Sequence, residues 1–285
     1  MTKNKAKSLA RLNIWGIIQL VILVFLVVVC FIPLLMGVLM SFKSTAQIYA
    51  DFFSLPNPIQ WGNYSKAALE LIRPLLNTLF IAVISIICGI ALASFAAYAF
   101  ARFRMFGKNF FFMILLSLMM VPGVLTLTPS FILTIQLNLR DSAYGLMLFY
   151  IAGSQAFAIF LLRSFFEAQP EELFESARLD GASELKSLIY IALPLARPIL
   201  VTIAIMNLLS YYNDLIFPML LLVTPEKHTL MIALQRYAPP EKTVARPDIA
   251  VQTAGYMLAC VPLLLIFSVG MKYYIQGITS GAIKG

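Results

Sequence analysis

Few side chains in this 285-residue sequence are of a kind that could make or break covalent bonds. The single histidine, His228, lies in a predicted loop, where a histidine is usually solvated. The sequence contains no G-x-x-x-x-G-K-[ST] loop for nucleotide phosphates, no H-E-x-x-H zinc motif, and no Ser/His/Asp or paired-carboxylate set within its apolar runs. Cys30, Cys88 and Cys260 stand alone in apolar runs, as small core side chains do. We therefore expect no catalytic residue, no metal site and no cofactor bound by this chain.

A polar cluster in a later apolar run could instead bind a solute. It consists of Asn207, Tyr211, Tyr212, Asn213 and Asp214. Tyrosine rings stack on the apolar face of a sugar, and asparagine amides hydrogen-bond its hydroxyl groups. An acid inside a membrane is costly and often marks a solute path. The alternative is that Asp214 caps a broken helix, and the sequence leaves both interpretations open.

The composition is that of a membrane protein with several spans. Hydrophobic residues make up 61% of the chain and charged residues 12%, and the mean hydropathy is +0.88. Soluble domains are about 45–50% apolar and about 25% charged, so a soluble domain, a disordered chain and a coiled coil are excluded. The net charge of +8 fits basic residues at the inner ends of spans better than a nucleic-acid partner.

Six apolar runs are long enough to cross a bilayer, which takes about 20 residues. They cover residues 14–40, 75–100, 110–135, 143–162, 199–222 and 250–271. The short segment 102–108 carries three basic residues and no acid, so the positive-inside rule favours both termini inside. Gly89, Ala93 and Ala97 recur every four residues and predict close helix packing. We expect an all-α fold of six transmembrane helices that forms a single domain over residues 1–285.

The segment 163–198 is too polar to span a membrane, yet it is strongly patterned. Pro170 suits the first position of a helix, and Asp180-Gly181 is a turn signal. Ser183 can cap a second helix that ends at Leu193-Pro194. The segment therefore predicts an inside hairpin of two short helices. Such a hairpin either lies on the membrane surface or seats its apolar face on a cytoplasmic partner.

Several motifs resemble those of ABC importer permeases, above all the EAA motif of the carbohydrate-uptake group. Residues Glu175 to Ala182, followed by Ile191, Leu193-Pro194 and Pro198, carry that motif, with Ser176 where the pattern has alanine. Trp61-x-Asn63-Tyr64, Asn77-Thr78-Leu79, the run Ala96 to Arg102 and the end Gly277 to Gly285 are also similar to the family, the last to MalG-type subunits of maltose importers. The resemblance covers nearly the whole chain.

The resemblance implies a permease subunit that forms the path for a sugar or oligosaccharide by alternating access. Its partners would be a second six-span permease, two ATPase subunits that hold ATP and Mg, an extracytoplasmic solute-binding protein and the lipid bilayer, without nucleic acid. Its place would be the bacterial or archaeal cytoplasmic membrane.

The resemblance also assigns roles to particular residues. The ATPase-coupling residues would be Glu175, Ser176, Ala177, Asp180, Gly181, Ala182, Leu193 and Pro194, and the tail residues Gly281, Lys284 and Gly285 would also reach the ATPases. An ABC permease for a polyol phosphate or another non-sugar solute is the alternative. An ion-coupled secondary transporter would be expected to carry several acids or histidines within its spans, and Asp214 is essentially the one candidate.

Overall fold

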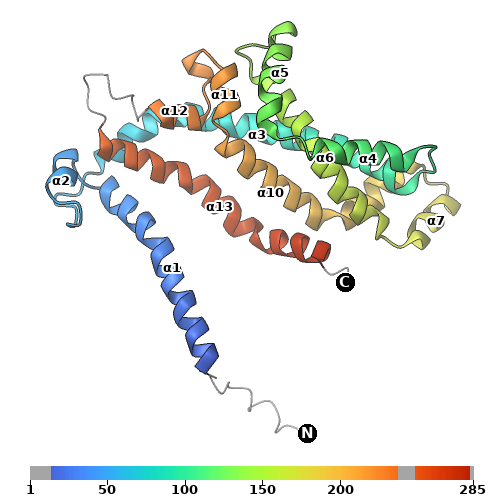
Figure 1. The fold of residues 1–285 in the computed structure, drawn as a ribbon, viewed down its shortest axis with the longest axis horizontal. Helices are drawn as coiled ribbons and strands as arrows, with labels where there is room; N and C mark the ends of the chain where they lie inside the picture. Colours follow the sequence, from blue (N-terminus) through green and yellow to red (C-terminus); the bar gives the residue numbers. More distant parts are fainter. Residues whose placement is uncertain (1–13, 237–247, 283–285) are drawn as a thin grey trace. The chain divides into compact units, whose positions relative to one another are not determined.

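The computed structural model describes residues 14–236 and 248–282, and every regular element in these ranges is a helix (Figure 1). The α-helices are α1 (Ile14–Ser41), α2 (Thr45–Ala50), α3 (Gly62–Arg102), α4 (Lys108–Leu118), α5 (Gly123–Gln136), α6 (Ala143–Glu167), α7 (Glu171–Leu179), α8 (Glu184–Ser187), α9 (Leu193–Leu195), α10 (Arg197–Asn213), α11 (Ile216–Leu221), α12 (Leu230–Arg236) and α13 (Ile249–Ala282). A π turn, η1 (Leu188–Ala192), and a 3₁₀ turn, η2 (Pro225–Lys227), complete the set. The chain divides into two compact units, residues 1–68 with 244–258 and residues 69–243 with 259–285.

Four helices are long and apolar enough to cross a membrane. They are Trp15–Ser41, Gly62–Arg102, Ala143–Glu167 and Ile249–Ser268. Two further pairs of helices qualify together, but each pair is bent, Lys108–Leu118 with Gly123–Gln136 by 95° and Glu184–Leu195 with Arg197–Asn213 by 77°. The described residues therefore hold four to six candidate spans, and each of the six predicted runs overlaps one of them, although the run 199–222 continues past the end of α10 at Asn213.

Three of the predicted spans differ in extent from the helices that contain them. α3 begins at Gly62, well before residue 75, and α6 continues to Glu167, into the segment predicted to be a loop. The run 110–135 is broken between α4 and α5, where Pro122 adopts an extended conformation. Proline has no N–H to continue the helix and restricts the residue before it. A run of high hydropathy shows how long and how apolar a segment is, so it does not detect a break in the helix.

The interior of the second unit is built around α3, α6 and α10. Ala93 and Ala97 are fully buried in a cluster with Leu162 of α6 and Ile203 of α10. A Cβ at Gly89 would lie 3.2 Å from the Ser154 hydroxyl of α6. The predicted close approach at the small-residue positions is therefore confirmed, because any larger side chain there would separate the helices.

The first unit is held by Asn63, which explains the Trp61-x-Asn63-Tyr64 motif. The buried Asn63 amide donates to the carbonyls of Ser41 and Lys43, both at 2.9 Å. Lys43 is itself fully buried and donates to the carbonyls of Asp51 and Phe52 at 3.1 and 2.8 Å. These bonds fix the end of α1 against the start of α3.

Candidate functional site

The predicted hairpin is present and is formed by residues 171–195, called the hairpin below. Pro170 precedes the first helical residue rather than occupying it. Glu171 and Glu172 occupy the first turn of α7 and Arg178 the last, so each charge suits the helix dipole. The turn is left-handed at Gly181, with φ of 78°, a conformation that favours glycine. The Ser183 hydroxyl then accepts from the Lys186 N–H and caps α8.

The second arm of the hairpin does not end at Leu193-Pro194 as predicted. α8 passes through the π turn η1 into α9, and the break comes only after Leu195. The Leu193 N–H donates to the carbonyl of Leu188, a five-residue spacing. A π turn shifts the register of the residues that follow it, which periodicity in the sequence does not reveal.

One face of the hairpin is buried by Phe174. Its ring is fully buried in the cluster that contains Tyr98, Phe166 and Leu188. The apolar face of the second arm is only half buried, because Leu185 and Ile189 are 53% and 44% exposed. The hairpin is therefore attached along one side and leaves apolar side chains outside.

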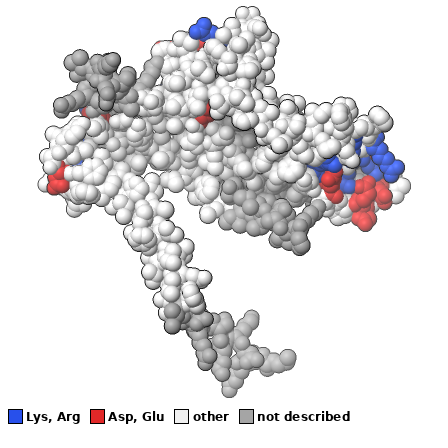
Figure 2. Space-filling view, in the orientation of Figure 1, with Lys and Arg blue, Asp and Glu red and all other residues white. Residues whose placement is uncertain are grey.

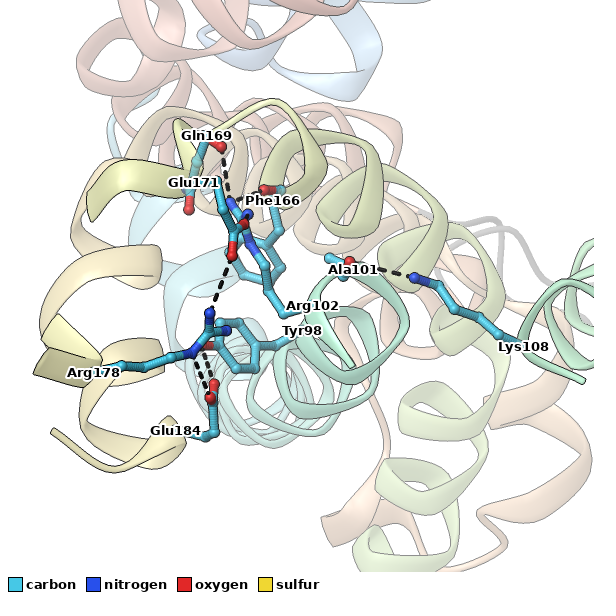
Figure 3. Close-up of polar contacts among 9 residues, drawn as sticks. All are labelled: Tyr98, Ala101, Arg102, Lys108, Phe166, Gln169, Glu171, Arg178 and Glu184. Atoms are coloured by element: carbon cyan, nitrogen blue, oxygen red, sulfur yellow. Dashed lines mark hydrogen bonds and ion pairs between the residues drawn. The ribbon is translucent and has the colours of Figure 1, made fainter. Parts of the chain in front are cut away.

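Arg102, the last residue of α3, attaches the hairpin to the end of that helix (Figure 3). Its guanidinium donates to the carbonyls of Phe166 and Gln169 at 2.7 and 2.9 Å and to the carboxylate of Glu171. The guanidinium carbon lies 3.9 Å from the centre of the Phe174 ring. The Arg102 side chain is only 6% exposed. A planar guanidinium can serve a carboxylate, two carbonyls and a ring together, whereas an ammonium cannot.

A second arginine closes the network across the hairpin (Figure 3). Arg178 donates to Glu171 and to Glu184, each at 3.1 Å, and the Tyr98 hydroxyl donates to Glu184 at 2.8 Å. The carboxylates of Glu184 and Glu171 raise the pKa of Arg178 above its usual value through these hydrogen bonds. Figure 2 shows acidic and basic side chains gathered together at this end of the second unit. Exposed ion pairs contribute little singly, so the buried Arg102 is the main attachment.

The predicted coupling residues of the first arm lie together at the open side of the hairpin. Glu175, Ser176, Asp180 and Gly181 are exposed, and Ala177 and Ala182 are partly buried. Leu179 beside them is 89% exposed. Leu193 and Pro194 lie apart from them, on the second arm. A groove next to Glu175 is lined by Phe103, Arg104 and Met105. An exposed apolar side chain on a rigid turn can occupy a pocket of a partner.

The residues of the charge network were not predicted from the sequence. They are Tyr98, Arg102, Glu171, Arg178 and Glu184. From the sequence, Arg102 was only one of the basic residues of segment 102–108 and the last residue of a run similar to the family. One feature of the sequence could have predicted this network. The two short helices carry acids, and an arginine stands at the end of a long apolar run, where it could pair with them.

The polar cluster around Asp214 lies at a break in a helix, which was one of the two interpretations left open. α10 ends at Asn213, and Asp214 is extended. Its carboxylate accepts from the Ile216 N–H at 3.1 Å and from the Tyr150 hydroxyl of α6 at 2.9 Å. Tyr211 stacks on Tyr150 with ring centres 4.2 Å apart. Asp214 thus joins the end of α10 to α6.

The five predicted path residues are not all brought together. The Tyr212 hydroxyl donates to the carbonyl of Ala259 on α13, on another side of α10. The Asn213 amide donates to the carbonyl of Leu209 within its own helix. The amide nitrogen of Asn207 is buried and has no hydrogen-bond partner among the described residues. Asn207 and Tyr211, four residues apart on α10, share one face of that helix, and Asp214 follows its end.

The far end of the second unit has its own polar contacts. The carboxylate of Asp141 accepts from the Lys227 ammonium at 2.8 Å, from the Thr224 hydroxyl, and from the N–H groups of Val223 and Thr224. These hydrogen bonds, the one from Lys227 first, hold the pKa of Asp141 well below its usual range. His228, expected to be solvated, is only 5% exposed, because its loop folds against α3.

This chain is similar to membrane components of transport systems, both in sequence and in structure. A family model described as the binding-protein-dependent transport system inner membrane component matches residues 85–279. The diacetylchitobiose uptake system permease protein NgcG of Streptomyces coelicolor is 29% identical over 281 residues, which cover 98% of this chain and 89% of the relative. The arabinooligosaccharides transport system permease protein AraQ of Halalkalibacterium halodurans is 28% identical over 268 residues, covering 92% and 94%.

A solved structure is also similar. It is a chain of a bacterial ABC transporter involved in the import of the acidic polysaccharide alginate. The TM-score is 0.82 at 26% identity, and the match covers 93% of this chain and 98% of that one.

Proposed function

The chain belongs to the family of binding-protein-dependent transport system inner membrane components, and we propose that it is the carbohydrate-translocating permease subunit of an ABC importer. Relatives named for diacetylchitobiose and arabinooligosaccharide uptake support an oligosaccharide as the cargo. The transporter with the similar fold imports alginate, which is also a polysaccharide.

The hairpin is the observation that carries the proposal. Its turn exposes Glu175, Gly181 and Leu179, while Phe174 and Arg102 attach its other side to the helices of the second unit. We propose that the exposed turn is the docking element for an ATPase subunit. On a hairpin that lay on lipid the apolar side of α7 would face the membrane, whereas Phe174 is buried against the helices of the second unit.

The arrangement in the membrane follows from this assignment. The chain would form one domain with six spans, the two bent pairs each counting as one, with both termini and the hairpin inside. Gly281 is in the last turn of α13, and Lys284 and Gly285 lie outside the described residues, so contact of this tail with the ATPases stays a prediction. Positive charge at segment 102–108 supports this orientation.

The partners would supply what this chain lacks. A second six-span permease would complete the path, two ATPase subunits would bind ATP and Mg, and a solute-binding protein would deliver the sugar. The chain itself would not be an enzyme. We further propose that the face of α10 with Asn207 and Tyr211, together with Asp214 after its end, borders the path.

The test is the recovery of partners with a tagged copy purified from native membranes. We expect mass spectrometry to find a second six-span chain and a P-loop ATPase. The combined change Glu175→Ala and Gly181→Trp should lower ATPase recovery at least tenfold and leave the second permease bound. It alters the exposed turn, where tryptophan at a left-handed φ is strained.

The matched control changes two exposed residues at the other end of the unit, Tyr144→Ala and Glu226→Ala. It should recover the ATPase in full. Recovery of the chain alone, or equal recovery with both double variants, would contradict the proposal and return the ion-coupled transporter to consideration.

A further inference from the structure

A cavity of about 660 Å³ lies beside the segment 103–107, which joins α3 to α4. Three basic side chains line it, Arg104 of that segment, Lys108 of α4 and Arg163 of α6. None of the described residues that line it is an acid. Its size falls in the range of about 300–1,000 Å³ that is usual for small-ligand sites. The cavity therefore suits an anionic occupant.

The three cations are only partly neutralised within the chain. Arg104 is exposed and forms no hydrogen bond or ion pair with the described residues. Lys108 donates to the carbonyl of Ala101 at 3.3 Å, which is a neutral partner (Figure 3). Arg163 donates from Nε to Glu167 at 2.8 Å, and its two Nη atoms form no hydrogen bond within the described part of the chain. Arg104 and Lys108 therefore have no counter-ion there.

Apolar side chains next to these charges are exposed. Phe106 of the same segment is completely exposed, and Phe110 and Met113 of α4 are 62% and 65% exposed. Phe110 and Met113 are three residues apart, so they share one face of α4. A soluble anion would leave these side chains in water, whereas a lipid has both an anionic head and apolar chains. Basic and aromatic side chains together are typical of a segment at a membrane surface.

The other side of the same segment has acids. Residues 103–105 also line the groove beside the hairpin, which Glu171, Glu175 and Glu184 border. An acidic protein surface that covered the whole segment would be repelled by these carboxylates. A small anionic head group in the cavity would not contact them. This separation of charge favours a lipid over an acidic protein as the occupant.

We propose that the cavity binds the phosphate group of an anionic phospholipid through Arg104, Lys108 and Arg163. Guanidinium and ammonium groups bind phosphate oxygens through charge-assisted hydrogen bonds. Phe106 and Phe110 would lie beside the acyl chains. The segment follows the candidate span α3 and precedes the bent pair that begins with α4, so it lies where the chain leaves the membrane. The site lies outside the path for cargo, and its place on the inner surface rests on the orientation in the proposed function.

The experiment is hydrogen–deuterium exchange by mass spectrometry on the chain purified with its bound partners and reconstituted in nanodiscs. One set of nanodiscs contains phosphatidylcholine alone, and the others contain increasing fractions of phosphatidylglycerol. In the wild type, phosphatidylglycerol should slow exchange in residues 103–110 by about threefold or more, because bound lipid opposes local opening. In the double variant Arg104→Gln and Lys108→Gln this slowing should disappear, because both unpaired charges are lost.

A second arm separates a lipid from a soluble phosphate. Glycerol phosphate, which has the same head-group chemistry without acyl chains, is added to the protein in phosphatidylcholine nanodiscs. We expect it to leave exchange in residues 103–110 unchanged. Slowing equal to that with phosphatidylglycerol would overturn the lipid assignment. Phe106→Ser keeps all three charges and should weaken the response to phosphatidylglycerol, because the apolar contact is lost.

A matched control removes the same charge elsewhere in the second unit. Arg73 and Arg140 are exposed and do not line the cavity. The double variant Arg73→Gln and Arg140→Gln should keep the wild-type slowing in residues 103–110. Loss of the slowing in this control as well would show a general effect of net charge and would count against the site.

The remaining outcomes also decide the question. Exchange that is slow in phosphatidylcholine and does not respond to phosphatidylglycerol would show that a protein partner covers the segment, which overturns the inference. If the Arg104 and Lys108 double variant does not assemble, Arg104→Gln and Phe106→Ser alter exposed side chains and replace it. A wild-type response in both would overturn the inference. None of these results depends on recovery of the ATPase, so failure here leaves the proposed function intact.

Discussion

At the scale of single residues, one carboxylate at each end of the second unit accepts several hydrogen bonds and so connects the segments there. Glu171 joins Arg102 to Arg178, and Asp141 joins the start of α6 to the loop that follows α11. Each acid connects segments that are far apart in the sequence. Glu171 binds Arg102, and Asp141 binds Thr224. Such charge-assisted bonds are stronger than neutral ones, and removing one partner leaves the others unsatisfied.

Replacing Asp141 with asparagine should make the protein less stable and less sensitive to acid. Lys227 and Thr224 depress the pKa of Asp141, so its contribution is complete above the unfolded-state value of about 3.9. It is lost as pH falls through the folded-state value. At pH 7 the melting temperature of Asp141→Asn should be lower by about 2–4 °C. Below about pH 4 the two curves should converge.

The measurement is thermal unfolding of the purified assembly across this pH range. Glu70→Gln is the control, since Glu70 is exposed and has no hydrogen bond or ion pair among the described contacts. A constant difference between Asp141→Asn and wild type at every pH would show that the charge of Asp141 is not the cause.

At the scale of elements, α7 has one face packed against the protein and another exposed to solvent. Phe174 is fully buried below the Arg102 guanidinium, and Leu179 is 89% exposed beside the turn. Local sequence signals located this helix, because its acids, Gly181 and Ser183 act within a few residues. They did not locate η1, whose wide turn depends on how Leu188 and Ala192 pack against α3 and α10.

Alanine substitutions at Phe174 and Leu179 should separate stability from docking. Phe174→Ala leaves a cavity and should cost about 3–5 kcal/mol, with faster hydrogen exchange throughout the hairpin. Leu179→Ala removes an exposed side chain and should change stability by less than about 0.5 kcal/mol. It should nevertheless lower ATPase recovery several-fold. Unchanged ATPase recovery with Leu179→Ala would remove this side chain from the docking surface.

At the scale of the whole molecule, the sidedness of the membrane arrangement is the property that all the proposals share. In a background with Cys30, Cys88 and Cys260 replaced by alanine, single cysteines report the side of each segment. Glu226→Cys should react with an impermeant maleimide in intact cells. Ser176→Cys should react only after the membrane is opened, and reaction of both in intact cells would contradict the orientation.

The sequence by itself determined the class and the family of this protein. Its hydropathy gave the all-helical membrane fold, and the residues from Glu175 to Pro198 gave the resemblance that the family model bears out. The turn at Gly181 was also predictable. These features depend on composition or on residues close together in the chain, so each can be read without knowing how helices pack.

Only the tertiary structure decided which polar residues meet. It placed Asp214 at a helix break with Tyr150, separated Tyr212 from Tyr211, and joined Arg102 to Glu171 across 69 positions. It also showed that α3 binds the hairpin through Tyr98 and Arg102 at one end and the loop 223–230 through Asn77 at the other. Contacts of this kind depend on the crossing and register of whole helices, which arise from the packing of many side chains and leave no local pattern in the sequence.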